Sequence, residues 1–196
     1  MNVNRTDWTW RTVDIVVAAA IAIAFGVVIW GWNQLWAAAT PAFVAIPAAQ
    51  NILYGMWLLP AVLGGLIIRK PGAALFTELV AAAVSAILGS QWGLDALASG
   101  FVQGIGAEVV FFAMRYRVWT IPVVAAAAVA SALTAWVHDV ALYYLDIGVG
   151  PQLAILAFMV VSAIVIAGIG SWLLMRSLVQ TGVLAQFPAG RAQQRV

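Results

Sequence analysis

The class of fold is indicated by residues 13–32, which read VDIVVAAAIAIAFGVVIWGW. Asp14 is the only charged residue in this stretch. At about 1.5 Å of rise per residue, a helix of about 20 residues crosses the roughly 30 Å of hydrocarbon in a bilayer. The stretch therefore predicts a transmembrane helix, and similar stretches recur along the chain.

The composition of the 196 residues also indicates an integral membrane protein. Hydrophobic residues make up 65% and charged residues 8%, against about 45–50% and about 25% in soluble domains. So few charges cannot cover the surface of a soluble domain, and so high a hydrophobicity excludes a disordered chain. Cysteine is absent, which excludes disulfides and thiolate chemistry.

Six apolar stretches predict an all-α integral membrane protein with six transmembrane helices. Residues 1–180 would form this single domain, and residues 181–196 would form a polar cytoplasmic tail. The long first connection, residues 33–50, would either close over a site as a lid or be a slack linker. The expected helices are residues 13–32, 51–68, 73–89, 97–114, 118–145 and 152–179.

Lysine and arginine residues predict the orientation, because cytoplasmic loops are enriched in them. With six alternating spans, all nine basic residues fall on one side. The loops of the other side carry Asp95 and Asp146. We therefore expect a multi-pass protein of the bacterial cytoplasmic membrane, with both termini in the cytoplasm.

No enzymatic motif is present. Lys70 is the only lysine and is followed by Pro71, so the chain has no GxxxxGK[ST] phosphate-binding loop. The single histidine belongs to no HExxH motif and to no plausible Ser-His-Asp order. We expect no catalytic residues, no cofactor, no metal and no nucleic-acid partner. Uphill transport would need another subunit or an ion gradient.

Ionisable residues inside the spans are functional candidates, because each costs roughly 2.5–3.5 kcal/mol to insert. Glu108 lies near the expected bilayer midplane of the fourth span, and Gln103 lies on the same helix; we expect both to contact a ligand. Alternatively, Glu108 pairs with Arg115 or with another helix. Glu78 lies closer to the cytoplasm, where pairing with Arg69 or Arg115 is favoured over a transport role.

The outer end of the fifth span combines rings with an acid. Trp136, Asp139 and Tyr143 share one helix face, and His138 lies on the neighbouring stripe. Aromatic faces attract cations and stack on flat rings, while a carboxylate neutralises positive charge. An aromatic belt at the headgroup level is the alternative, but a belt needs no acid. We favour a binding site.

Further candidates lie at the outer ends of the second and third spans. Asn51 and Tyr54 share a helix face with Trp57 beside them, and Gln91 and Trp92 follow the third span. Together, amides, rings and acids from several spans predict a small-molecule pocket near the outer side.

Small residues recur along the first span, where Ala18, Ala22 and Gly26 are four positions apart. Such stripes let helix backbones approach closely in lipid. The stripe would either pack inside this protein or form a face for a partner helix, and the sequence leaves both open.

Three segments carry a family resemblance. They read RTVDIVVAA (11–19), LYGMWLLPAVLGGLIIRKPGAALFTELVAAAVSAILGSQWG (53–93) and SGFVQGIGAEVVF (99–111). The chain, apart from its C-terminal tail, resembles the YkoE-type substrate-binding (S) components of energy-coupling-factor (ECF) transporters.

The resemblance implies an S-component-like bundle of six helices, with a pocket near the outer face that is closed by external loops. It implies a cargo of thiamine or its hydroxymethylpyrimidine precursor, and assembly in the lipid membrane with a transmembrane coupling protein and two cytoplasmic ATPase subunits. The face of the first helix that meets the coupling protein would be Ala18, Ala22 and Gly26. The pocket residues above come from chemistry and position, because no residue motif of the better-understood thiamine-specific S-components matches.

We therefore predict the substrate-binding membrane subunit of an ATP-driven vitamin uptake transporter. One alternative is a structural or assembly subunit without its own ligand, in which the rings form a belt. Another is an autonomous secondary carrier that uses Glu108 as a proton site.

Overall fold

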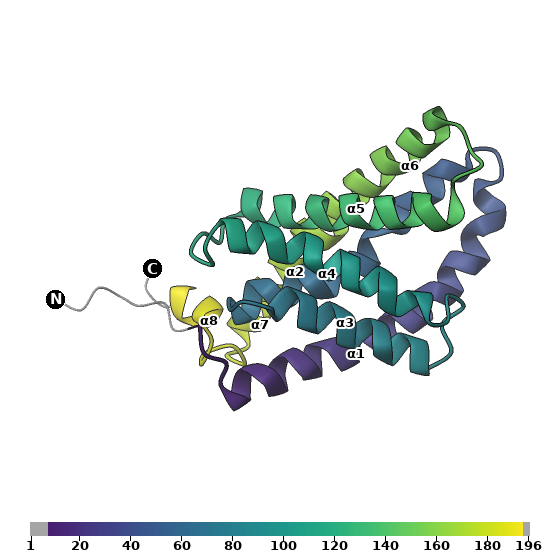
Figure 1. The fold of residues 1–196 in the computed structure, drawn as a ribbon. Helices are drawn as coiled ribbons and strands as arrows, with labels where there is room; N and C mark the ends of the chain where they lie inside the picture. Colours follow the sequence, from purple (N-terminus) through teal and green to yellow (C-terminus); the bar gives the residue numbers. More distant parts are fainter. Residues whose placement is uncertain (1–7, 194–196) are drawn as a thin grey trace.

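The computed structural model describes residues 8–193, and these fold into a bundle of helices (Figure 1). The α-helices are α1 (Thr12–Ala39), α2 (Gly55–Ile68), α3 (Ala73–Ile87), α4 (Asp95–Ala113), α5 (Ile121–Tyr143), α6 (Val149–Ser162), α7 (Gly170–Gln180) and α8 (Pro188–Gln193). Two 3-10 helices, η1 (Thr40–Phe43) and η2 (Pro47–Leu53), connect α1 to α2, and a π-helix, η3 (Ala163–Ile169), connects α6 to α7.

Six crossings of the bundle confirm the predicted class of fold. Helices α6, η3 and α7 run on without a break, so that residues Val149–Gln180 form one apolar segment. Five segments are long and apolar enough to cross a membrane, and α3 is a shorter apolar helix that makes the sixth crossing. The start of α1 and helix α8 consequently lie at the same end of the bundle (Figure 1).

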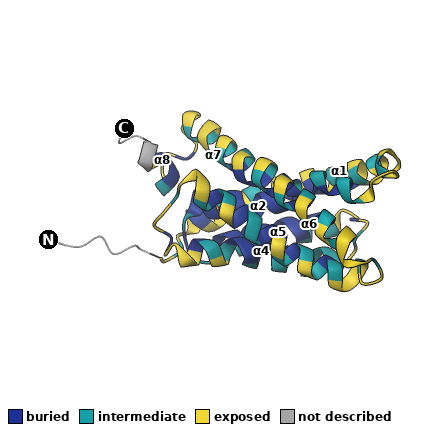
Figure 2. Ribbon diagram, turned by 90° about the horizontal axis from the view of Figure 1, so that it is seen from above, coloured by how far each residue is buried: buried dark blue, intermediate teal, exposed yellow. Residues whose placement is uncertain are grey.

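Helix α2 is the centre of the bundle. Apart from Met56, every one of its residues from Gly55 to Ile68 is buried. A helix that is apolar on all sides is expected to be surrounded by other helices. Figure 2 shows the buried residues concentrated on α2 and on the inner faces of its neighbours. The other spans pack around it, with α1 against α3, α3 against α4 and α4 against α5.

The small-residue stripe of α1 lies inside this bundle. Ala18 and Ala22 are fully buried, and a Cβ placed on Gly26 would lie 2.5 Å from Val84 Cβ of α3. The assignment of this stripe to a coupling protein is therefore wrong: the close approach serves the packing of α1 on α3. The exposed side chains of α1 belong to other positions, such as Ile15 and Ile23.

The connection between the first two spans is more ordered than expected. Helix α1 continues to Ala39, seven residues beyond the predicted end, and η1 and η2 occupy most of the rest. Trp32 Nε1 donates to Leu53 O at 3.0 Å, and Gln50 Nε2 donates to Trp36 O at 2.9 Å. These bonds hold the connection against α1, because buried backbone carbonyls need donors.

Part of the predicted polar tail is folded. Helix α8 follows a turn, and the side chains of Leu184 and Phe187 are almost completely buried. These apolar groups pack into the same hydrophobic core as the spans. The sequence between residues 182 and 191 is therefore part of the domain.

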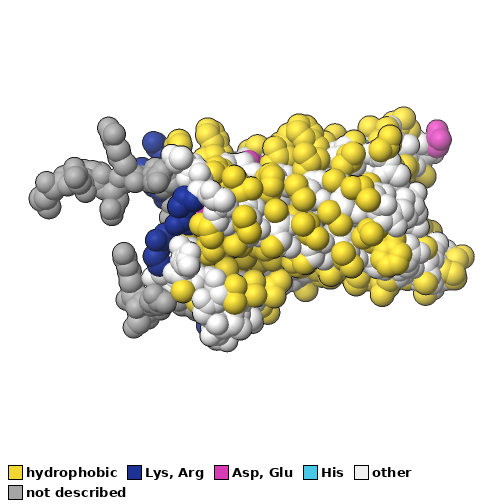
Figure 3. Space-filling view, turned by 90° about the horizontal axis from the view of Figure 1, so that it is seen from below, with side chains coloured by type: hydrophobic (Ala, Val, Ile, Leu, Met, Phe, Trp, Pro, Cys, Tyr) yellow, Lys and Arg dark blue, Asp and Glu magenta, His cyan; other side chains and the backbone are white. Residues whose placement is uncertain are grey.

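The two ends of the bundle differ in charge. The basic end carries the turns 69–72 and 115–117 and helix α8. The acidic end, opposite to it, carries η1, η2 and the connections at residues 88–94 and 144–148. Figure 3 shows lysine and arginine side chains gathered at one end of the molecule, and a broad apolar surface over the rest of that face. Such a surface is expected for a protein surrounded by lipid.

Candidate functional site

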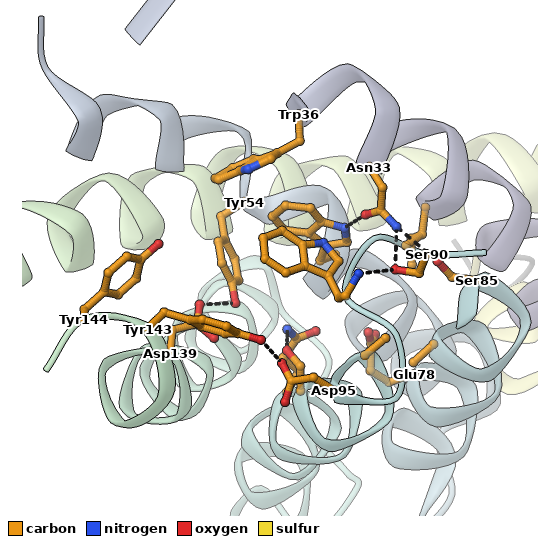
Figure 4. A pocket seen from close by; sticks show the side chains of 18 residues that line it. Asn33, Trp36, Tyr54, Glu78, Ser85, Ser90, Asp95, Asp139, Tyr143 and Tyr144 are labelled. Atoms are coloured by element: carbon orange, nitrogen blue, oxygen red, sulfur yellow. Dashed lines mark hydrogen bonds between the residues drawn. The ribbon is translucent and has the colours of Figure 1, made fainter. Parts of the chain in front are cut away.

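A cavity of about 180 Å³ opens at the acidic end and extends into the bundle (Figure 4). Along α4 it reaches from Asp95 to Gln103, a rise of about 12 Å. Its walls come from α1, α2, α3, α4, α5 and the connections at the acidic end. The lining residues are Ile29, Asn33, Trp36, Tyr54, Trp57, Glu78, Ala82, Ser85, Ser90, Trp92, Asp95, Ala96, Ser99, Gly100, Gln103, Asp139, Tyr143 and Tyr144.

Aromatic rings form a continuous series along one side of the cavity. The ring of Trp57 lies 4.8 Å from that of Trp36, 5.0 Å from that of Tyr54 and 6.2 Å from that of Trp92. Trp92 in turn lies 5.9 Å from Tyr143. These separations lie within the range in which aromatic pairs stabilise one another. The series offers flat faces to a planar ligand.

Two aspartates at the mouth of the cavity are joined by a histidine. His138 Nδ1 lies 3.0 Å from Asp139 Oδ1, and its Nε2 lies 3.2 Å from Asp95 Oδ1. Tyr54 donates its hydroxyl to Asp139 Oδ2 at 2.7 Å, and Tyr143 donates to Asp95. This network fixes both carboxylates, which come from different helices, at the side of the cavity.

An amide orients the opposite wall. Asn33 Oδ1 accepts a hydrogen bond from Trp57 Nε1 at 2.9 Å, and its Nδ2 donates to Ser90 Oγ at 3.0 Å and to Ser85 Oγ at 3.3 Å. Asn33 is almost completely buried. The indole of Trp57 is thereby held in one orientation, since buried polar groups adopt the geometry that satisfies them.

Glu78 lies at the depth of the cavity and is almost completely buried. Its Oε2 accepts a hydrogen bond from the backbone N–H of Ala61 at 2.8 Å. No basic residue within residues 8–193 forms an ion pair with it, so the expected pairing with Arg69 or Arg115 is wrong. A carboxylate at this depth is costly unless a ligand or a proton compensates its charge.

Six of the eleven residues expected in the pocket line the cavity: Tyr54, Trp57, Trp92, Gln103, Asp139 and Tyr143. His138 is not a lining residue but touches two that are. Trp136 turns toward α6, where its Nε1 donates to Gln152 O at 2.9 Å. Asn51 is buried and donates to Ala48 O, and Gln91 is exposed. The assignment of Trp136, Asn51 and Gln91 to the lining is corrected accordingly.

Glu108 lies at the basic end, outside the cavity. Its carboxylate accepts hydrogen bonds from the backbone N–H groups of Gly72, Ala74 and Leu75, at 2.7, 3.0 and 3.3 Å. It also accepts one from the hydroxyl of Tyr116 at 2.5 Å. The first N–H groups of a helix lack partners within the helix and attract negative charge. Glu108 therefore caps α3, and its assignment to the ligand pocket is corrected.

Burial, together with the Glu108 carboxylate, raises the pKa of Tyr116. The phenol therefore remains a neutral donor to Glu108 at physiological pH. Tyr116 lies in the turn before α5 and Glu108 lies on α4, so this bond ties the turn and α4 together at the start of α3.

Sequence reasoning missed several lining residues, among them Asn33, Trp36, Glu78, Asp95 and Tyr144. Asn33 continues the buried stripe of α1 at helical spacing, a signal that was lost when the helix was ended at residue 32. Glu78 was visible as an acid inside a span. Asp95 and Tyr144 gave no such signal, because only tertiary packing turns them toward the cavity.

Comparisons with known proteins agree with this architecture. Residues 13–134 match the family described as "ABC-type cobalt transport system, permease component". The chain is 33% identical over 184 residues to the "Putative HMP/thiamine permease protein YkoE" of Bacillus subtilis (strain 168), covering 93% of this chain and 92% of that protein. A solved structure described as "Crystal structure of an S-component of ECF transporter" superposes with a TM-score of 0.91 at 32% identity, covering 95% of this chain and 94% of that chain.

Proposed function

Because the chain belongs to the YkoE-type family of S-components of ECF transporters, we propose that its cavity captures thiamine for uptake into the cell. An S-component is a multi-pass membrane protein that binds a small molecule and works with energy-coupling partners, and it is not an enzyme.

The charge of the cavity is the observation that carries the choice of cargo. Glu78, Asp95 and Asp139 line it together with six aromatic residues, and no lysine, arginine or histidine among residues 8–193 lines it. Rings and acids without a basic side chain favour an aromatic cation. Thiamine combines a thiazolium cation with an aminopyrimidine. Hydroxymethylpyrimidine is neutral, so it can donate hydrogen bonds to the carboxylates but lacks the charge attraction that the thiazolium adds.

Tight binding of a cation in this cavity would require that water be excluded from it. Nanomolar binding needs about 12 kcal/mol of net free energy. Cation–π contacts contribute about 0.5–2 kcal/mol each, with the larger values in desolvated sites. Trp36 lines the cavity and the η1–η2 connection follows α1 at the same end of the bundle, so we propose that this segment acts as the lid that excludes water.

Titration of the purified full chain tests the cargo. Trp36, Trp57 and Trp92 line the cavity, so binding should change the intrinsic tryptophan fluorescence. We expect saturable binding of thiamine below 1 µM, a scale of about 8 kcal/mol, and binding of hydroxymethylpyrimidine at least about tenfold weaker. Equal affinity for both compounds would reject the charge argument, and no binding of either at micromolar concentration would reject the cargo.

Cobalt is named in the description of the matched family, but the cavity does not favour a metal cargo. Within the part of the chain that the structure describes, no group of three or more His, Cys, Asp or Glu is placed to hold a metal ion. The aromatic lining also has no role in binding a hydrated cation. Cobalt(II) added in the same titration is therefore expected to leave the fluorescence and the thiamine affinity unchanged.

We also propose that a transmembrane coupling protein and two cytoplasmic ATPase subunits supply the energy. The sequence has no phosphate-binding loop of its own, and the family is defined by such coupling. The basic end would face the cytoplasm and the acidic end, with the cavity, would face outward. Thiamine uptake into vesicles should require the partner subunits; uptake by this chain alone would favour a secondary carrier.

Two alternatives lose support from the geometry. A subunit without a ligand does not account for a cavity lined by three carboxylates. A carrier with Glu108 as its proton site conflicts with the four hydrogen bonds that hold this carboxylate at the start of α3.

A further inference from the structure

A second pocket, of about 370 Å³, lies at the basic end of the bundle. Its lining includes four cationic side chains, those of Arg11, Arg69, Lys70 and Arg191. They come from the start of α1, from the turn between α2 and α3, and from α8. Only the folded chain brings these groups together, and none of them belongs to the cavity at the acidic end.

Two carboxylates contact residues that line this pocket, and both already have partners. Asp14 is bound by Arg11 at 2.7 Å and by Lys70 at 2.6 Å. Glu108 caps α3 and accepts the hydroxyl of Tyr116, which lines the pocket. Four cations beside two carboxylates leave an excess of two positive charges among the described residues. The pocket is therefore suited to an anion.

Arg69 is the cation with the clearest capacity for such an anion. Its Cζ lies 5.1 Å from the ring centroid of Trp119, and its Nε donates to Leu66 O at 3.0 Å. Burial lowers the pKa of Arg69 to about 10, which leaves the guanidinium charged at neutral pH. No carboxylate of residues 8–193 forms an ion pair with it. Its terminal nitrogens can therefore bind a phosphate group with two parallel hydrogen bonds.

The position of the pocket indicates where the anion would come from. The lysine and arginine side chains in Figure 3 lie at the border of the apolar surface, the level of the lipid headgroups. Trp119 and Tyr116 are of the residue types that are enriched at this level. Basic pockets between transmembrane helices bind anionic lipid headgroups.

We propose that this pocket binds a phosphate group, carried by the headgroup of an anionic lipid or by a soluble phosphate compound. The phosphate contacts Arg69 from the turn between α2 and α3 and Arg191 from α8. It thereby joins the C-terminal segment to the centre of the bundle. This site is independent of the cargo proposal, because the two pockets share no lining residue.

Native mass spectrometry of the delipidated full chain tests the proposal. The protein is incubated with phosphatidylglycerol, phosphatidylcholine or inorganic pyrophosphate, and the retained molecules are counted. We expect phosphatidylglycerol to be retained about fivefold more than phosphatidylcholine, and Arg69→Gln or Arg191→Gln to lower this retention about fivefold. Arg191 is exposed, so its substitution should not impair folding.

Arg117→Gln is the matched control, since Arg117 is an exposed arginine of the same end that does not line the pocket. It should retain lipid like the unmodified chain. If the pocket variants lose pyrophosphate but not phosphatidylglycerol, the phosphate site stands and its ligand is soluble. If they retain both as the unmodified chain does, the proposal is overturned. If these variants retain both ligands but assemble poorly with the coupling subunits, the pocket binds an acidic side chain of a partner subunit instead of a phosphate.

Discussion

Individual carboxylates in this protein differ in role according to what they contact. Asp139 is held by Tyr54 and His138 beside an aromatic cavity, and it retains access to a ligand there. Glu108 is surrounded by the N–H groups at the start of α3. The chemistry of the two side chains is the same, so their roles follow from their surroundings.

Removal of the charge of Asp139 tests its part in recognition. In Asp139→Asn the amide oxygen can still accept from Tyr54, so the fold should be kept while the attraction for a cation is lost. We expect thiamine affinity to fall at least about tenfold, equivalent to about 1.4 kcal/mol, in a fluorescence titration. Asp146→Asn removes an acid of the same end that does not line the cavity, and it should bind as before. Similar losses in both variants would point to a general charge effect.

Glu108→Ala should lower stability and leave recognition unchanged. The substitution leaves N–H groups at the start of α3 without their acceptor, at a cost of about 1–3 kcal/mol. We expect a lower midpoint of thermal unfolding in detergent, while the folded fraction binds thiamine with unchanged affinity. A large loss of affinity in folded protein would return Glu108 to the binding site.

At the scale of the elements, close backbone approach organises the bundle. A Cβ on Gly55 would lie 2.4 Å from the carbonyl oxygen of Ser162, and Ser162 Oγ accepts from Gly55 N and donates to Ile52 O. Ser162 directly precedes the π-helix η3, a conformation in which the usual helical bonds are displaced. The sixth span is thus fastened to the start of α2, next to Tyr54 of the cavity.

A pair of glycine substitutions in α1 tests the packing of α1 on α3. In Gly26→Ala the new methyl group would meet Val84 and the carbonyl oxygen of Ala81, at 2.5 and 2.9 Å. In Gly31→Ala it would meet no atom within 4 Å. We expect Gly26→Ala to lower the unfolding midpoint by an amount that corresponds to about 1–3 kcal/mol, and Gly31→Ala to leave it unchanged or raise it. Equal behaviour of the two variants would mean that the helices separate readily.

At the scale of the whole molecule, the asymmetric charges and the even number of crossings define two chemically different ends. Arginines lie at the basic end, beside the start of α1 and α8, and the cavity opens at the other end. The proposed capture of a cargo from outside requires this arrangement, because loops rich in lysine and arginine are expected to remain in the cytoplasm.

The absence of cysteine allows a direct test of orientation. Single cysteines replace Arg117, in the turn between α4 and α5, or Asp146, in the connection between α5 and α6; both positions are exposed. A membrane-impermeant maleimide added to intact cells should label Asp146→Cys, and should label Arg117→Cys only after lysis. The unmodified chain provides the unlabelled background. The reverse labelling pattern would invert the proposed transport direction.

Much of the architecture could be predicted from the chain because lipid imposes simple rules. Long apolar stretches must be helices whose backbone bonds are satisfied internally, so the class of fold and the number of crossings were accessible. Tyr54, Trp57 and Asp139 were found by helical spacing and chemistry. Trp136 and Glu108 were not placed correctly, because spacing defines a helix face but does not say which neighbour that face meets.

The order of amino acids is therefore enough to predict a six-span membrane protein that resembles S-components and has no ATPase motif. The packing of the helices is needed to see which polar groups form the cavity, which acid caps a helix and whether the small stripe of α1 faces inward. The reason is physical: hydrophobicity acts on each segment locally, whereas the environment of a side chain depends on helices that are distant in the sequence.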